Sequence, residues 1–385
     1  MNVPKLRFKE FKDEWSTIEL YKISSEISYG MGLPSKEYDG INKYIRITDI
    51  DENTSKYTNK DIVSPDGELE DKYIVKKNDI LFARTGASTG KTYLYDKKDG
   101  KLYYAGFLIK ANIINHDANF IFQQTHTSKY NKWIKVMSMR SGQPGINSQE
   151  YGSYKFSITS KTEEYKISKT LQLLDKKIEL QSKKIEALKL FKLELKERLF
   201  KIFETKQIEL KDIIIKWNKK NKDNKYSYVE SVSNKYGFIA QNEQFEDRNV
   251  ASNDTKNYYV IEKGVFAYNP SRLNVGSLAL KGNNKVSLVS PLYECFITNQ
   301  NNKFLYEWFN SKEFKKGTVS RFEGGVRNTL NFSNLCKIKI SLPSLENQNK
   351  ISNILNLYNN LIGFESQKLN KLIELKKGLM QSMFV

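Results

Sequence analysis

Cysteine and histidine are scarce in this sequence of 385 residues, and their scarcity argues against several kinds of site. The two cysteines, Cys295 and Cys336, do not form a close pair, so the sequence predicts neither a disulfide framework nor a zinc site. The two histidines, His116 and His126, stand well apart in a segment that looks partly extended, which argues against a shared metal ion. A Ser-His-acid or Cys-His catalytic arrangement is not credible either.

Long apolar runs are also missing. No stretch reaches the roughly 18 apolar residues that a membrane-spanning helix needs, and the N-terminal sequence MNVPKLRFKE has no apolar signal core. We therefore expect a cytoplasmic protein without membrane contact. Positive charge, in contrast, is abundant, because 63 Lys and Arg against 44 Asp and Glu give a net charge of +19. Such a field attracts polyanions, and nucleic acid is the first partner to expect.

The sequence repeats itself, because the segment from Lys166 to Phe200 aligns with the segment from Lys350 to Phe384 without a gap. In each copy apolar residues recur at steps of three and four, as in a heptad pattern. In the first copy these residues are Ile167, Leu171, Leu174, Ile178, Ile185, Leu188, Leu195 and Leu199. In the second copy they are Ile351, Leu355, Tyr358, Ile362, Leu369, Leu372, Leu379 and Met383. Polar residues interrupt both copies at the same two places, Gln181/Glu365 and Lys192/Lys376, which favours a common origin.

The repeat predicts the order domain, helix, domain, helix, with boundaries at residues 1–160, 161–204, 205–344 and 345–385. Segments such as YIRITDI from Tyr44, DILFAR from Asp79 and KIKISL from Lys337 predict strands within the domains. We therefore predict an α+β fold, with two mixed α/β domains held apart by two long coiled-coil helices and a pseudo-twofold internal repeat. Because the second domain connects the two helices, helices that pack along their lengths must be antiparallel. Two similar basic domains suit two separated sites on duplex DNA, and their different sequences predict different half-sites.

Three segments resemble catalytic motifs, but each departs from its motif. TGASTGKT, from Thr85, looks like a P-loop but has three residues between Gly86 and Gly90, where the motif needs four. NPSR, from Asn269, lacks the second proline and the aromatic residue of an adenine methyltransferase motif. PDGELEDK, from Pro65, resembles a nuclease metal site but has the polar composition of a turn. These departures argue against a catalytic site in the chain.

Four loops combine glycine with arginine, lysine, asparagine or glutamine: RTGASTGK, MRSGQPGIN, NPSRLNVG and RFEGGVRN. Arginine reads guanine through two hydrogen bonds, asparagine and glutamine read adenine, and glycine lets the backbone approach the duplex. A solvated turn is the alternative for any single loop. Their distribution over both domains favours DNA binding.

Along nearly its whole length the chain resembles the specificity subunit of type I restriction-modification enzymes. The resemblance rests on PKLRFKEFKDEW from Pro4, NDILFARTGASTGK from Asn78, YNPSRLNVGSLAL from Tyr268, SLPSLENQNKISNIL from Ser341 and KLIELKKGLMQSMF from Lys371. The first junction, SITSKTEEYKISKTL from Ser157, departs from the family pattern because it lacks the usual proline.

This resemblance implies that each domain is a target-recognition domain and reads one half of a bipartite, asymmetric DNA site. The paired helices would set the spacing and bind two modification subunits that methylate adenine, and restriction subunits of the nuclease-translocase type would join for cleavage. The chain itself would be non-catalytic and would hold no cofactor, because S-adenosylmethionine, ATP and magnesium would belong to the partners.

Matching positions to the family's loops predicts eleven DNA-binding residues. They are Arg84, Thr85, Ser88, Lys91, Gln143 and Asn147 in the first domain, and Arg272, Asn274, Arg321, Arg327 and Asn328 in the second. Two other classes stay open from the residues alone: a coiled-coil adaptor that binds no DNA, and a stand-alone DNA methyltransferase or nuclease.

Overall fold

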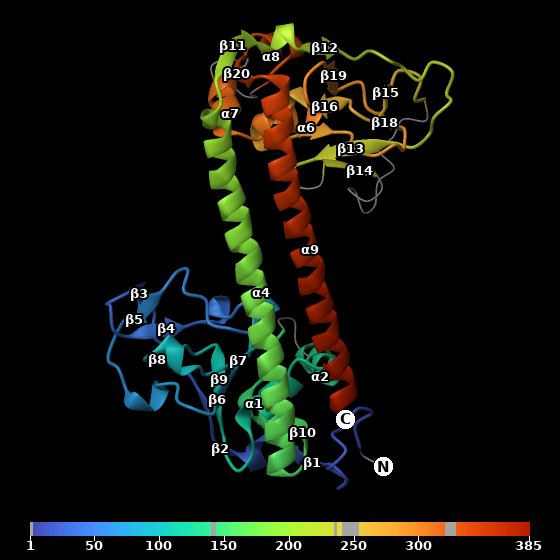
Figure 1. The fold of residues 1–385 in the computed structure, drawn as a ribbon. Coiled ribbons are helices and arrows are strands. Elements are labelled where there is room, and N and C mark those ends of the chain that lie inside the picture. Colours follow the sequence, from blue (N-terminus) through green and yellow to red (C-terminus); the bar gives the residue numbers. More distant parts are fainter. Residues whose placement is uncertain (1–2, 140–143, 235–236, 241–253, 320–328) are drawn as a thin grey trace. The chain divides into compact units, whose positions relative to one another are not determined.

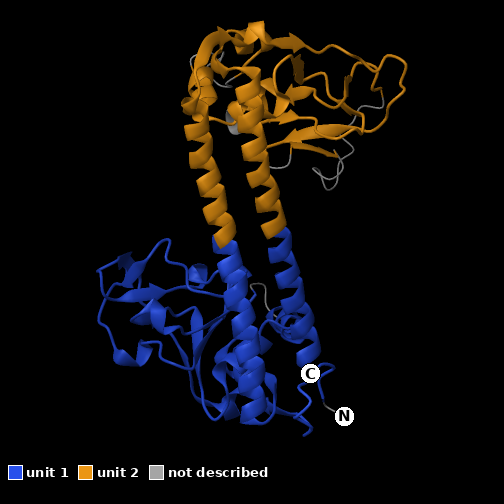
Figure 2. Ribbon diagram, in the orientation of Figure 1, with its two compact units in different colours: residues 1–183, 366–385 blue, residues 184–365 orange. Residues whose placement is uncertain are grey.

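The chain divides into two compact units, which Figure 2 distinguishes by colour. The computed structural model describes residues 3–139, 144–234, 237–240, 254–319 and 329–385. Unit 1 comprises Met1–Lys183 and Ser366–Val385, and unit 2 comprises Lys184–Glu365. The two long helices, α4 (Lys161–Ile202) and α9 (Leu345–Met383), therefore each contribute one part to either unit.

Unit 1 is built around a four-stranded antiparallel sheet with the strand order β2-β9-β6-β7 (Figure 1). These strands are β2 (Ser24–Tyr29), β9 (Leu108–Ile113), β6 (Asp79–Ala83) and β7 (Thr92–Leu94). Every residue of β6 is buried, as expected for an apolar central strand. Three two-stranded ladders complete the unit: β1 (Ser16–Glu19) with β10 (Lys155–Ile158), β3 (Ser35–Glu37) with β5 (Val63–Pro65), and β4 (Lys43–Ile45) with β8 (Leu102–Tyr104).

Unit 2 repeats this topology with a four-stranded sheet of order β12-β19-β16-β17. The strands are β12 (Ile214–Lys216), β19 (Glu294–Thr298), β16 (Phe266–Tyr268) and β17 (Leu278–Leu280). The ladder between β11 (Thr205–Glu209) and β20 (Lys339–Pro343) corresponds to the ladder between β1 and β10. The remaining ladders pair β13 (Glu230–Ser233) with β14 (Gly237–Ala240), and β15 (Tyr259–Ile261) with β18 (Ser287–Val289). The repeat found in the sequence is thus confirmed as a repeat of topology for the four-stranded sheet and for the ladder of the first and last strands.

The first helix after each sheet begins at the same position of the repeat. In unit 1 the helices are α1 (Ala118–Gln124), α2 (Ser128–Ser138) and α3 (Ser148–Ser153), and in unit 2 α6 (Asn302–Phe309), α7 (Lys312–Val319) and α8 (Phe332–Cys336). Asp117 caps α1 and Asn301 caps α6, each through a side-chain oxygen that accepts an N–H of the first turn. The same kind of short polar residue at the same repeat position therefore starts the corresponding helix in both units.

The two long helices are antiparallel where they pack. In unit 2, Lys184 pairs with Glu365, and further along α4 the ring of Phe191 lies 5.5 Å from that of Tyr358. In unit 1, Asp175 of α4 pairs with Lys376 of α9. All sixteen apolar residues of the predicted heptad pattern are buried or half-buried. The antiparallel coiled coil is thereby confirmed within each unit.

Each unit has its own apolar core. The core of unit 1 includes Trp15, Phe82, Phe120 and Tyr151 together with Met383 from the end of α9. The core of unit 2 includes Phe266, Phe296 and Trp308. Among the described residues, no helix combines the length and apolar character needed to cross a membrane.

One strand prediction was too long. The strand expected over YIRITDI ends at Ile45, and residues Ile47–Asp49 form a 3-10 turn instead. The cause is local, because the carboxylate of Asp49 accepts hydrogen bonds from both the backbone N–H and the side chain of Arg46.

Candidate nucleic-acid interface

The TGASTGKT segment forms the connection between the antiparallel strands β6 and β7. Four of its backbone N–H groups already donate within the protein: Gly86 to Pro144 O, Thr89 to Gly86 O, Gly90 to Ala83 O and Lys91 to Ser88 O. A P-loop instead leaves such groups free for phosphate oxygens and continues into a helix. This hairpin instead leads into strand β7 and uses four of its N–H groups internally, so it does not have the arrangement of a P-loop, as the residue spacing predicted.

Three of the predicted DNA-binding residues of unit 1 come together around one pocket. Arg84, Thr85 and Asn147 line a pocket of about 310 Å³ together with Met137, Gly145, Ile146 and Glu150. Strand β6 ends just before Arg84, and the residues around Asn147 return to it: Ile146 N–H donates to Arg84 O, and Thr85 bridges to Gly145. Two loops that are far apart in the sequence thus form one surface.

Asn147 has a structural task in this pocket. Its side-chain oxygen accepts the N–H of Glu150, and the carboxylate of Glu150 accepts the N–H of Asn147. This reciprocal pair is a capping box at the start of α3. It fixes the position of the loop that carries Asn147.

Tyr29, the last residue of β2, is a residue of this site that sequence reasoning missed. Its ring centroid lies 5.0 Å from the guanidinium carbon of Arg84, and its hydroxyl accepts the N–H of Ser148 at 3.0 Å. Burial of the ring opposes ionisation, but the bond from Ser148 and the charge of Arg84 outweigh it, so the pKa of Tyr29 lies below its usual value. No sequence motif links Tyr29 to Arg84. The two side chains come together because β2 and β6 both pair with β9.

Ser88 and Lys91, which were also predicted to bind DNA, are not among the residues that line the pocket beside Arg84. Ser88 lies in the 3-10 turn Gly86–Ser88 of the same hairpin and is half-buried. Lys91 lies on the hairpin too, with its ammonium group 4.0 Å from the carboxylate of the exposed Glu52. Gln143 lies outside the described residues.

In unit 2 the corresponding loop follows β16 and forms the 3-10 helix Pro270–Val275. Arg272 lies on it and is exposed. The backbone of Asn274 belongs to the same turn, whereas its side chain, like Arg321, Arg327 and Asn328, lies outside what the structure describes. Asn269 caps the turn, since its side-chain oxygen accepts the N–H of Ser271. That capping role accounts for the NPSR segment in structural terms.

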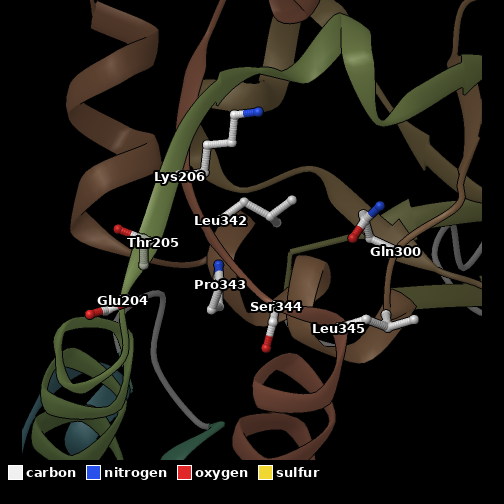
Figure 3. A pocket seen from close by; sticks show the side chains of 8 residues that line it. All are labelled: Glu204, Thr205, Lys206, Gln300, Leu342, Pro343, Ser344 and Leu345. Atoms are coloured by element: carbon white, nitrogen blue, oxygen red, sulfur yellow. The ribbon is translucent and has the colours of Figure 1, made fainter.

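A second pocket, of about 510 Å³, lies in unit 2 where β11 and β20 meet the start of α9. Figure 3 shows its lining residues: Glu204, Thr205, Lys206, Gln300, Leu342, Pro343, Ser344 and Leu345. None of them is among the predicted DNA-binding residues. Its single lysine and single glutamate give it no clear charge preference.

Comparison with known proteins identifies the family. A family model described as the type I restriction modification DNA specificity domain matches the chain twice, over residues 29–190 and 199–374. The chain therefore belongs to this family, and the resemblance inferred from its motifs is confirmed.

A curated relative is named as the putative type I restriction enzyme MjaX specificity subunit of Methanocaldococcus jannaschii. It is 26% identical over 176 residues, and the match spans 43% of this chain and 41% of the relative, less than half of either protein.

Solved structures share the fold over nearly full length. The crystal structure of a type I restriction-modification S subunit from M. genitalium covers 100% of this chain and 99% of its own, with a TM-score of 0.60 at 15% identity. A structure from work on complex assembly and conformational transition of the type I restriction-modification system covers 96% of this chain and 97% of its own, with a TM-score of 0.56 at 14% identity. At these identities the likeness concerns the fold.

Proposed function

We propose that this chain is the DNA-reading subunit of a type I restriction-modification complex. The observation that carries the proposal is the double match to a DNA specificity domain, once for each unit. The loops after β6 and β16 differ in sequence although the sheets around them have the same strand order. Each unit would therefore read a different half of a bipartite, asymmetric site.

The partners follow from the same proposal. Members of the specificity-subunit family are non-catalytic, so two modification subunits would methylate adenine with S-adenosylmethionine, and restriction subunits using ATP and magnesium would cleave the DNA. The net charge of +19 supports binding to the duplex, because it favours association with phosphates. The predicted contacts in the second domain, Arg272, Asn274, Arg321, Arg327 and Asn328, belong to this proposal together with those of the first.

Exposed apolar residues on the long helices support two equivalent partner sites. Leu173, Leu180 and Leu375 belong to unit 1, and the residues at the same repeat positions, Leu357, Phe364 and Phe191, belong to unit 2. All six are at least 50% exposed and lie outside the heptad pattern. Because seven residues make about two helical turns, Leu173 and Leu180 share a face, as do Leu357 and Phe364. The same surface in both units suits two copies of one partner.

The decisive experiment maps methylated adenines in the DNA of the source cell, with and without this gene. We expect methylation at one two-part sequence that disappears when the gene is deleted. Methylation unchanged by the deletion would contradict the proposal. Methylation of DNA by the purified chain with S-adenosylmethionine and no other protein would instead support a stand-alone enzyme.

The partner surface can be tested separately. Leu180→Asp in unit 1 should reduce the number of bound modification subunits from two to one, and Phe364→Asp should remove the other copy. Gln172→Asp is the matched control, because it introduces the same charge at an exposed position about 80° around the helix from Leu180. This variant should keep both copies. Mass measurement of the assembled complex gives the count, and two copies on both variants would exclude this surface.

A further inference from the structure

Arg84 is fixed by its backbone and by a contact of its side chain, unlike a residue in a solvated turn. Its backbone N–H donates to Phe107 O at 3.0 Å, and its carbonyl accepts the N–H of Ile146 at 2.9 Å. The guanidinium group lies over the ring of Tyr29. Within the described part of the chain, the buried Nε of Arg84 has no hydrogen-bond partner. The side chain thus lies against Tyr29 with one buried donor unsatisfied among the described residues.

Tyr29 is itself fixed at both ends. Its backbone pairs with Ile109 in the four-stranded sheet, and its hydroxyl is held by the N–H of Ser148 at the start of α3. The capping box of Asn147 and Glu150 fixes that start in turn. The sheet and α3 therefore set the position of the ring, and the guanidinium of Arg84 lies against that ring.

A cation–π contact acts through the charge of a guanidinium and leaves its N–H groups able to donate to a ligand. A fork of two parallel N–H groups matches the O6 and N7 atoms of guanine, the commonest specific arginine contact in the major groove. The pocket beside Arg84, lined also by Thr85 and Asn147, gives space for the edge of a base. Lys91 differs, since a lysine has no planar fork and its ammonium lies near Glu52.

We propose that Arg84 reads one guanine in the first half-site, that Tyr29 is the residue that positions it, and that Lys91 contacts a phosphate. This inference rests on the proposed function, because it needs unit 1 to face DNA. It separates Arg84 and Lys91, both predicted from the sequence to bind DNA, into a base reader and a backbone contact, and it adds Tyr29 as a positioning residue.

The test uses the complex assembled with its modification subunits and a pool of duplexes randomised at both half-sites. The unaltered complex should enrich one two-part sequence with an invariant guanine in one half. Arg84→Lys keeps the charge but loses the fork, so we expect roughly tenfold to hundredfold weaker binding to that sequence and loss of the guanine preference at one position only. The other half-site should be unchanged.

Two variants at Tyr29 separate positioning from folding. Tyr29→Leu should relax the same guanine position, whereas Tyr29→Phe keeps the ring and loses only the hydroxyl bond to Ser148, so it should relax the preference less. Lys91→Ala should weaken binding to all sequences about equally and reduce the salt dependence.

Three results would count against the inference or the function, and they differ. If Arg84→Lys weakens all sequences uniformly, Arg84 is a phosphate contact and the inference is wrong. If Tyr29→Leu keeps the guanine preference, Tyr29 does not position the reader. If the unaltered complex enriches no two-part sequence, the proposed function itself fails.

Discussion

In each unit a polar cluster connects the domain to the long helices. The two clusters occupy the same positions of the repeat, but their carboxylate and carboxamide side chains have changed places. In unit 1, Gln123 of α1 donates to Asp175 of α4 at 3.3 Å, and Asp175 pairs with Lys376 of α9 at 2.6 Å. The corresponding cluster of unit 2 consists of the residues at the matching positions of the repeat. There Asn359 of α9 donates to Glu307 of α6 at 3.4 Å, and Glu307 pairs with Lys192 of α4 at 2.7 Å.

The carboxylate therefore belongs to the long helix in unit 1 and to the domain in unit 2. The carboxamide is exchanged in the opposite sense, while a lysine from the other long helix is common to both. Unit 2 also has Lys196, 3.7 Å from Glu307, where unit 1 has Met380. The difference shows that the polar residue of each domain complements the residue on the helix that follows it in the chain. Combining a domain with the other long helix would bring together two carboxylates or two carboxamides.

The largest expected effect comes from removing the carboxylate of unit 2. Glu307→Gln leaves Lys192 and Lys196 without their counter-charge, and Lys196 is only 4% exposed. Breaking a buried pair on one side costs about 3–5 kcal/mol, so we expect the free energy of unfolding of unit 2 to fall by about 3 kcal/mol. Denaturant unfolding measures this loss, and hydrogen exchange in α6 locates it.

The matched control is Asp175→Asn in unit 1. Asp175 is 32% and Lys376 is 25% exposed, so solvent screens this pair and its loss should cost about 1 kcal/mol or less. Equal losses from the two substitutions would show that the clusters do not differ in burial energy.

A smaller loss of stability is expected when Gln123 in unit 1 is replaced by glutamate, which unit 2 has at the corresponding position as Glu307. Gln123→Glu places a second carboxylate beside Asp175 with Lys376 as the shared cation, and we expect a loss of about 2 kcal/mol at pH 7. Repulsion raises the pKa of one carboxyl in the folded state above its unfolded value. Protonation then relieves the penalty, so the loss should shrink as the pH falls from about 6 to about 4, and should change no further below that. A loss that does not change with pH would point to packing instead of charge.

Completing the exchange should reverse part of that loss. Gln123→Glu combined with Asp175→Asn recreates the arrangement of unit 2 in unit 1. We expect the double variant to be more stable than the sum of the single variants by about 1 kcal/mol. Denaturant unfolding of all four proteins gives this coupling energy, and simple additivity would mean that the residues do not form one cluster.

Part of this comparison could be predicted from the sequence. The internal alignment of the chain predicted the long helices, and it also showed Lys192 and Lys376 as a shared interruption of the apolar pattern. Their partners were not predicted, because Gln123 and Glu307 differ in charge and lie on short helices far away in the chain. A heptad pattern reports which face of a helix is buried, but not which polar group from another element meets an interruption.

The candidate interface was predicted to a similar extent. The loop beginning at Arg84 was found from its composition, and the structure places Arg84, Thr85 and Asn147 around one pocket. Contact of these residues with DNA stays a prediction. Tyr29 was missed because it lies far ahead of Arg84 in the chain, and only the pairing of β2 and β6 with β9 brings the two side chains together.

The smallest expected effect concerns Lys196, whose repeat counterpart is Met380. Burial lowers the pKa of Lys196 although Glu307 opposes the shift, so the folded protein releases this proton at a lower pH than the unfolded chain. The unfolded state then binds more protons just below the usual lysine pKa of 10.5, and stability should rise with pH in that window. Lys196→Met should remove this rise and change the free energy of unfolding at pH 7 by less than about 1 kcal/mol, because the lost bond to Asn310 O is offset by the lost burial cost. Unfolding measured from pH 7 to 10 gives both quantities.

Met380→Lys should place a buried lysine in unit 1 and introduce the same rise of stability with pH there. A pH profile identical in the unaltered protein and both variants would show that Lys196 is not the residue that distinguishes the two clusters.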